Sequence, residues 1–147
     1  MRLRISTPMA VVVDTDQAHH VRVEDKSGAL GVLAHHADLL TVLEPSVLTW
    51  RDGDGTEHHV ALRGGVFSVV DGSVAVATRE AVPGDDLIAL EEEVVTRFRA
   101  AREAEIAARL GTARVQLAAL QQMTRYLRGT GRPLRGTGRP LRGREDL

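Results

Sequence analysis

The sequence contains no cysteine, and this absence excludes disulfide bonds, thiolate metal sites and thiol nucleophiles. Only four of the 147 residues are aromatic, which weakens any case for a base-stacking surface or an aromatic cage. The longest uninterrupted apolar run is Met9–Val13, far below the roughly 20 residues of a membrane-spanning helix. The first residues carry positive charge but no apolar h-region follows them, so we do not expect a signal peptide. We therefore expect a soluble cytoplasmic chain, which could still sit on a membrane complex.

Neither sign of charge dominates, because 19 Lys and Arg face 20 Asp and Glu, and this balance excludes a uniformly basic nucleic-acid binder. The distribution along the chain is nevertheless uneven. Residues 1–83 carry a net charge of −4, residues 84–110 a net −3, and residues 111–147 a net +6. Basic charge is therefore concentrated in the last quarter of the sequence.

Residues 1–83 have the pattern of short strands separated by turns. Asp71-Gly72 lies between two β-rich runs, and such a pair is a strong signal for a two-residue hairpin because the turn needs positive φ. The segment from Asp52 to Gly55 predicts a looser turn between two further strands. Val66–Val70 is apolar on both faces, as in a strand buried on both sides. We predict a β sandwich of about ten short strands over residues 1–83.

The periodicity changes after Pro83-Gly84, and residues 84–128 predict an antiparallel α-helical hairpin. Asp85 and Asp86 supply an N-cap and first-turn carboxylates. Apolar residues then recur at helical spacing, and Glu105 is placed to pair with Arg109 one turn later. Gly111 is a C-cap candidate and Thr112 a new N-cap, so a very short turn is expected there.

Residues 129–147 repeat a Gly, Arg and Pro unit that predicts a disordered basic tail. An arginine in an extended Gly/Pro frame can enter a narrow minor groove, so a small DNA-associated module is the alternative function. A low-complexity extension is the simpler interpretation, and no nucleic-acid partner is expected.

The sequence contains only weak signals for a catalytic or metal-binding site. Three His-His pairs begin at His19, His35 and His58, but no metal-ligand spacing accompanies them. Asp52-Gly53-Asp54-Gly55 resembles the start of a calcium loop without its later ligands. No nucleophile is placed beside a base, and no phosphate-binding loop is present. We therefore predict no catalytic residue, no metal site and no cofactor.

One stretch carries a family resemblance. Residues 27–43 read S-G-A-L-G-V-L-A-H-H-A-D-L-L-T-V-L, similar to G-x-L-G-I-L-P-G-H-A-x-L-L-T-x-L in the epsilon subunit of F-type rotary ATP synthases. The similarity continues at residues 60–69, with a double glycine, and at residues 74–77 and 81–86. It covers roughly residues 1–128. The segment from Arg79 to Leu87, with residues 97–100, most resembles the alternate (N-type) branch.

The resemblance implies a non-catalytic rotor subunit at the cytoplasmic face of the cell membrane. The β domain would join the gamma subunit to the membrane c-ring, with Gly28, Ala29, Leu30, Gly31 and His36 as contact candidates. Because a rotor coupling must be stiff, a sandwich suits this role.

The resemblance also implies that the helices act as a switch on ATP hydrolysis. In related subunits this region either folds against the sandwich or extends to the alpha/beta catalytic ring, and Arg114, Arg125 and Arg128 are the candidates for contact with that ring. Two departures from the family pattern stand out. Ala34 and His35 replace the usual Pro-Gly, and Asp86 is followed by Ala89 where ATP-binding members have arginine, so ATP binding is not carried over.

Overall fold

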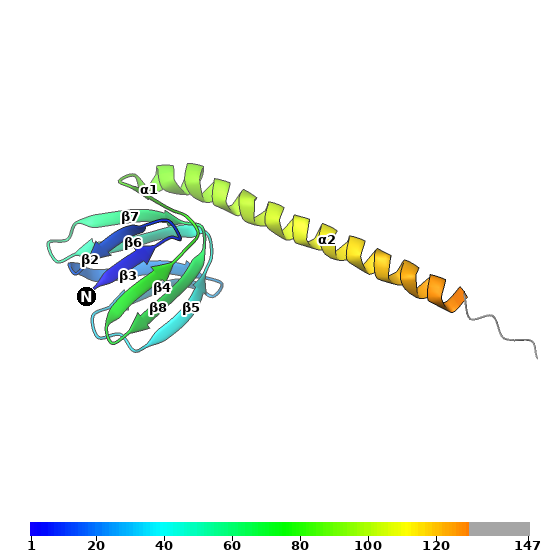
Figure 1. Cartoon of the computed structure of the whole chain (residues 1–147). Helices are drawn as coiled ribbons and strands as arrows, with labels where there is room; N and C mark the ends of the chain where they lie inside the picture. Colours follow the sequence, from blue (N-terminus) through cyan, green and yellow to red (C-terminus); the bar gives the residue numbers. More distant parts are fainter. Residues whose placement is uncertain (130–147) are drawn as a thin grey trace, which may run out of the picture. The chain divides into compact units, whose positions relative to one another are not determined.

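The computed structural model describes residues 1–129, which divide into one unit over Met1–Glu105 and a second from Ile106 onward. The first unit contains ten strands (Figure 1). They are β1 (Leu3–Ser6), β2 (Val11–Thr15), β3 (Ala18–Asp25), β4 (Gly28–Leu33), β5 (Leu39–Leu43), β6 (Ser46–Asp52), β7 (Glu57–Leu62), β8 (Gly65–Val70), β9 (Ser73–Ala77) and β10 (Ala81–Gly84). The ten short strands expected from the sequence are confirmed.

The strands form one hydrogen-bonded path that folds back on itself as a sandwich. Its order is β10-β7-β6-β3-β5-β8-β9-β1-β2, and among the described strands β4 pairs with β3 alone. A single residue pair, Asp25 with Leu43, joins β3 to β5. The strands before this junction and those after it enclose one apolar core, whose largest fully buried side chain is Phe67. Core residues alternate with exposed ones, because successive side chains on a strand point to opposite faces.

The turns follow the local sequence. Asp71 and Gly72 have φ of 48° and 73° between β8 and β9, as a two-residue hairpin turn with two positive φ angles requires. The segment from Asp52 to Gly55 closes the β6–β7 hairpin, with a hydrogen bond of 3.0 Å from the Gly55 amide to the Asp52 carbonyl. Both predicted turns are confirmed.

A second core covers the outer face of β6, β7 and β10. The register aligns Val47 with Ala61 and Ala61 with Val82, so these three side chains share one face. Leu90, Val95 and Phe98 from the helical segment pack against them. The paired ends of these strands, residues 46–48 of β6 and 60–62 of β7, are consequently buried on both faces.

The helical segment begins with α1 (Leu87–Ala89), continues as a π-helical stretch η1 (Leu90–Val95) and ends with α2 (Thr96–Gly129). The Asp86 side chain accepts hydrogen bonds from the backbone amides of Ile88 and Ala89 at 3.0 and 3.2 Å, so the predicted N-cap is confirmed. None of the helices within residues 1–129 is long and apolar enough to cross a membrane.

The predicted helical hairpin is wrong, because α2 is one continuous helix through Gly111 and Thr112. Gly111 does not have the positive φ of a C-cap glycine. The Thr112 hydroxyl donates to the Ala108 carbonyl four residues earlier, at 3.0 Å, instead of capping a new helix. A helical glycine costs only about 1 kcal/mol relative to alanine, which is too little to force a turn. The predicted tail lies outside the described residues, apart from Gly129.

The double glycine before and at the start of β8 is required by the backbone. Gly64 and Gly65 have φ of 68° and 125°, a region that favours glycine. A Cβ on Gly65 would lie 2.2 Å from the Ala77 carbonyl oxygen of β9. This close approach lets β8 pair with β5 and β9 at the same time.

We predict that Gly65→Ala lowers the free energy of unfolding by about 3 kcal/mol or more, because overpacking and a strained φ each cost about 1–3 kcal/mol. Gly72→Ala is the matched control, since Gly72 also has positive φ but nothing within 4 Å of an added Cβ. Urea unfolding followed by the fluorescence of Trp50 measures both. Equal losses in the two variants would contradict the steric argument.

Candidate functional site

The predicted contact residues lie along one edge of the sandwich. Gly28, Ala29, Leu30 and Gly31 are the first four residues of β4, which pairs with β3 over its whole length and with no other described strand. Three of the four are exposed, and Leu30 is half-buried against the core. His36 lies in the loop after β4, with its Nδ1 2.7 Å from the Ala37 carbonyl oxygen. The candidates therefore form one continuous stretch, an open strand edge and the loop that follows it.

The turn before Gly28 is held by Asp25. One carboxylate oxygen accepts from the amide and hydroxyl of Ser27, at 2.8 and 2.5 Å. The other accepts from the Thr41 hydroxyl of β5 at 2.9 Å. The Ser27 hydroxyl, the Thr41 hydroxyl and the backbone amides hold the pKa of the Asp25 carboxyl below its usual range. Asp25 thereby fixes this turn at the only point where β3 meets β5.

His35, which stands where the family pattern has glycine, has an unusual backbone conformation. Its φ is 64°, in the left-handed region that glycine adopts most easily. The amide of the next residue, His36, donates to the Leu33 carbonyl at 3.2 Å and closes the bend. A non-glycine residue therefore holds a left-handed backbone at this position, at some cost in strain.

A second surface was not predicted from the sequence. Val66 and Val70 of β8 were expected to be buried on both sides of their strand, but they point outward and are exposed. Val42 of β5 pairs with Val66, and Leu40 lies two residues before it on the same face. These four side chains are between 44% and 72% exposed. We call them the apolar sheet face, and a contiguous apolar patch of this kind marks an interaction site.

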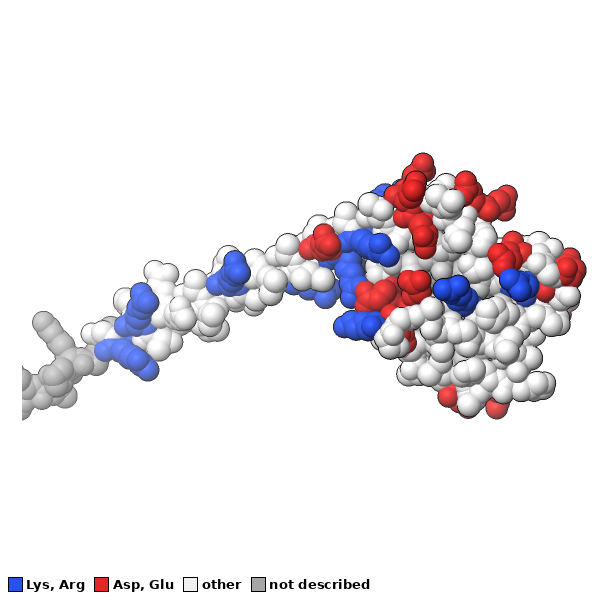
Figure 2. Space-filling model, turned by 180° about the vertical axis from the view of Figure 1, so that it is seen from behind, with Lys and Arg blue, Asp and Glu red and all other residues white. Residues whose placement is uncertain are grey.

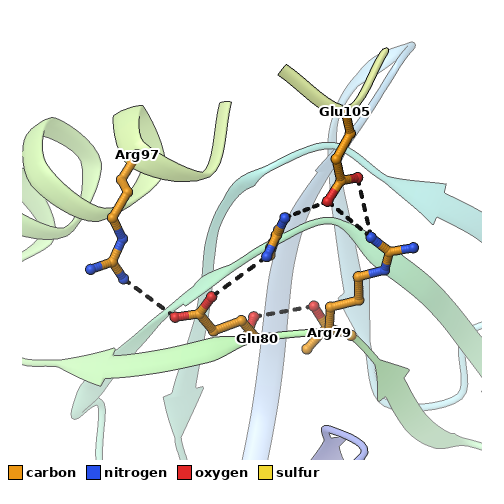
Figure 3. A network of polar contacts seen from close by, with 6 residues as sticks. Arg79, Glu80, Arg97 and Glu105 are labelled. Atoms are coloured by element: carbon orange, nitrogen blue, oxygen red, sulfur yellow. Dashed lines mark hydrogen bonds and ion pairs between the residues drawn. The ribbon is translucent and has the colours of Figure 1, made fainter. Parts of the chain in front are cut away.

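An ionic network ties the start of α2 to the sandwich (Figure 3). Glu105 accepts from Arg63 at 2.5 Å and from Arg79 at 3.1 Å. Glu80 accepts from Arg97 at 3.4 Å. Arg102 pairs with Glu44, which lies between β5 and β6. The pairing of Glu105 with Arg109 expected from the sequence is replaced by these longer-range contacts.

The three predicted regulatory arginines lie in the second unit. Arg114, Arg125 and Arg128 fall within roughly 60° of one another around the axis of α2, because they are eleven and three residues apart. Residues 106–129 contain four arginines and no acidic residue, and blue side chains alone follow this part of the helix in Figure 2. The arginines therefore share one face of a helix segment whose charged residues are all basic.

The histidines make local polar contacts. His58 Nε2 lies 2.6 Å from Asp52 Oδ2, and its ring stacks on Trp50. His59 Nδ1 lies 2.9 Å from the Thr49 hydroxyl. Within residues 1–129, no group of three histidine, aspartate or glutamate side chains is arranged to hold a metal ion. In the segment that resembles a calcium loop, Asp54 accepts from the Thr56 amide at 3.0 Å, as in an ordinary Asx turn.

We predict that the stability contributed by Asp25 depends on pH. Because the pKa of its carboxyl is lowered by folding, the contribution is present above the ordinary aspartate value of about 3.9 and is lost as the pH falls through the lower folded value. Asp25→Asn should remove this part of the acid dependence. Urea unfolding of both proteins between about pH 2 and pH 6 measures it. Parallel pH profiles for the two would contradict the role of Asp25.

Comparisons with known proteins agree with this architecture. Residues 1–84 match the family model described as ATP synthase, Delta/Epsilon chain, beta-sandwich domain. The chain is 41% identical over 128 residues to the ATP synthase epsilon chain 2 of Cereibacter sphaeroides, covering 86% of this chain and 88% of that one. It is 40% identical over 129 residues to the ATP synthase epsilon chain 2 of Paraburkholderia xenovorans, covering 87% and 93%.

A solved structure is similar over a shorter span. It belongs to the Euglena gracilis mitochondrial ATP synthase, described as OSCP/F1/c-ring in rotational state 1, with a TM-score of 0.55 and 26% identity. The match covers 71% of this chain and 62% of the Euglena chain. The DNA-associated alternative finds no support among these relatives. The chain belongs to the ATP synthase delta/epsilon chain family, and within it to the epsilon chains of the alternate branch.

Proposed function

We propose that this chain is a non-catalytic central-stalk subunit of a rotary ATP synthase, which couples the c-ring to gamma and the catalytic ring. Its near-full-length similarity to two ATP synthase epsilon chains carries the proposal. As part of that membrane-associated complex it lies at the cytoplasmic face of the cell membrane. The sandwich transmits torque, because close-packed interiors have low compressibility and transmit strain.

The apolar sheet face is the surface that gamma covers. Val42 and Val66 pair across β5 and β8, and Leu40 and Val70 extend the patch along the two strands. A stable partner surface needs an apolar centre. The apolar sheet face supplies one, because it exposes four large apolar side chains on one face of the sandwich. The edge formed by β4 and the His36 loop is then left for the c-ring.

The second unit is the regulatory arm. Its apolar residues alternate at spacings of four and three, which is the heptad pattern of a coiled-coil seam. The seam consists of Ile106, Leu110, Ala113, Leu117, Leu120 and Leu127, with the polar Thr124 at one of its positions. Arg109, Arg114 and Arg128 flank it, so a second copy would place arginine against arginine. The arm therefore suits an acidic partner surface on the alpha/beta ring, where it limits ATP hydrolysis.

We predict that Val42→Asp reduces co-purification with co-expressed gamma at least tenfold, because a carboxylate at the centre of the apolar sheet face would be desolvated without a partner. Met9→Asp is the matched control, since Met9 is 92% exposed and lies outside this face. Circular dichroism checks that both variants are folded. Full retention of gamma by Val42→Asp would exclude this face as the gamma contact, and failure of the unaltered chain to bind gamma would exclude the proposed function.

We predict that replacing Arg114, Arg125 and Arg128 together by glutamine raises ATP hydrolysis by the assembled complex several-fold, because the arm loses its attraction to an acidic surface. A control replaces Arg4, Arg22 and Arg99, which removes the same charge from outside the arm. Steady-state hydrolysis by complexes of equal subunit content is the measurement. An unchanged rate would remove the regulatory role and leave the rotor assignment intact.

A further inference from the structure

Arg63 and Arg79 border two hollows in the first unit. One, of about 440 Å³, is lined by both arginines together with Ser6, Thr7 and Thr78. The other, of about 200 Å³, is lined by the same two arginines with Arg102 and Glu105. The two guanidinium groups thus stand between two open spaces, and the smaller of these also borders Val42 of the apolar sheet face.

The charges around these hollows do not balance. The ionic network contains four arginines, namely Arg63, Arg79, Arg97 and Arg102, but only the three carboxylates of Glu44, Glu80 and Glu105. Glu44 forms an ion pair with Arg102, and the nearest partner of Glu80 is Arg97. Glu105 is therefore shared between Arg63 and Arg79, and one positive charge remains in excess at this point.

Arg79 retains unused hydrogen-bond donors. It reaches both carboxylate oxygens of Glu105 through Nη1 alone, at 3.1 Å each, and Figure 3 shows no dashed line at its other two nitrogens. Its Nε and Nη2 have no partner within residues 1–129, and the side chain is 62% exposed. The planar guanidinium can offer these two nitrogens side by side to two oxygens of one anion.

The hydroxyl groups of the larger hollow restrict the class of ligand. Ser6 donates to the Val76 carbonyl at 3.3 Å, and Thr78 donates to the Glu80 carbonyl at 3.2 Å. Thr7 donates to the Ala10 carbonyl at 3.2 Å. Because these hydroxyl protons are committed, the free donors that line the hollow are cationic. A ligand that brings acceptor oxygens and negative charge fits this arrangement.

We propose that the larger hollow, lined by Arg63 and Arg79, binds a phosphate-sized oxyanion, with Arg79 as its main ligand. The carboxylate of Glu105 already occupies the opposite side of the same guanidinium groups and acts as an internal competitor. A dianion neutralises the excess charge better than one shared carboxylate does. Binding of the anion consequently weakens the tie between Glu105 and the sandwich at the start of α2.

The test is titration of the full-length chain with inorganic phosphate at constant ionic strength, followed by calorimetry and by amide shifts at Thr78 and Gly65. We expect saturable binding that is at least tenfold weaker in Arg79→Gln and tighter in Glu105→Gln. Arg22→Gln is the matched control, because it removes the same charge from an exposed position on β3. The fluorescence of Trp50 verifies that each variant is folded.

Two results would overturn the proposal. One is the absence of saturable binding both by the unaltered chain and by Glu105→Gln. The other is an equal loss of affinity in Arg79→Gln and Arg22→Gln, which would indicate general charge attraction. Arg79→Lys gives an independent reading, because it keeps the charge and removes the two-pronged donor. Weaker phosphate binding by this variant supports the site, and unchanged binding contradicts it.

Discussion

The burial on both faces of residues 46–48 in β6 and 60–62 in β7 is the constraint from which the rest of the first unit follows. Their inner side chains close the sandwich, and their outer side chains need a cover. That cover is η1 with the first turns of α2, anchored by Phe98. Removing a buried phenylalanine side chain costs about 3–5 kcal/mol, whereas an exposed ion pair contributes at most about 1 kcal/mol. The apolar contact thus supplies the attachment, and the ionic network fixes its register.

The same logic applies to the other outer face of the sandwich. The outer face of β6 and β7 is covered by the chain's own helical segment, but that of β5 and β8 keeps Leu40, Val42 and Val66 in water. Within residues 1–129, no segment packs on these side chains as η1 packs on Val47 and Ala61. A small sandwich gains no stability from such a patch by itself. Its presence is understandable if a partner completes the burial.

Much of this architecture could be predicted from local sequence. Asp71-Gly72 specifies its turn and Asp86 its cap, because both act through contacts within a few residues. The sequence also indicated the edge from Gly28 to His36, but only through family resemblance. The partners of Glu105 could not be predicted in this way, since Arg63 and Arg79 are brought to it by strand pairing across the fold. The apolar sheet face was missed because a strand buried on both sides and one awaiting a partner have the same pattern.

The hairpin prediction failed for a reason that bears on the arm. Glycine followed by threonine permits a turn but does not compel one, since the penalty for a helical glycine is only about 1 kcal/mol. The large apolar side chains from Ile106 to Leu120 are 47–70% exposed, so packing within residues 1–129 contributes little to the choice. Most of the stability of a helix in a protein comes from tertiary packing of its apolar face, so small energies decide the form of a segment that lacks such packing. A partner surface can therefore select a straight or a bent arm at low cost, whereas the sandwich, closed around Phe67, cannot be changed so cheaply. The stiff sandwich unit ends at Glu105, the last residue of the ionic network, and the adaptable helix segment begins after it.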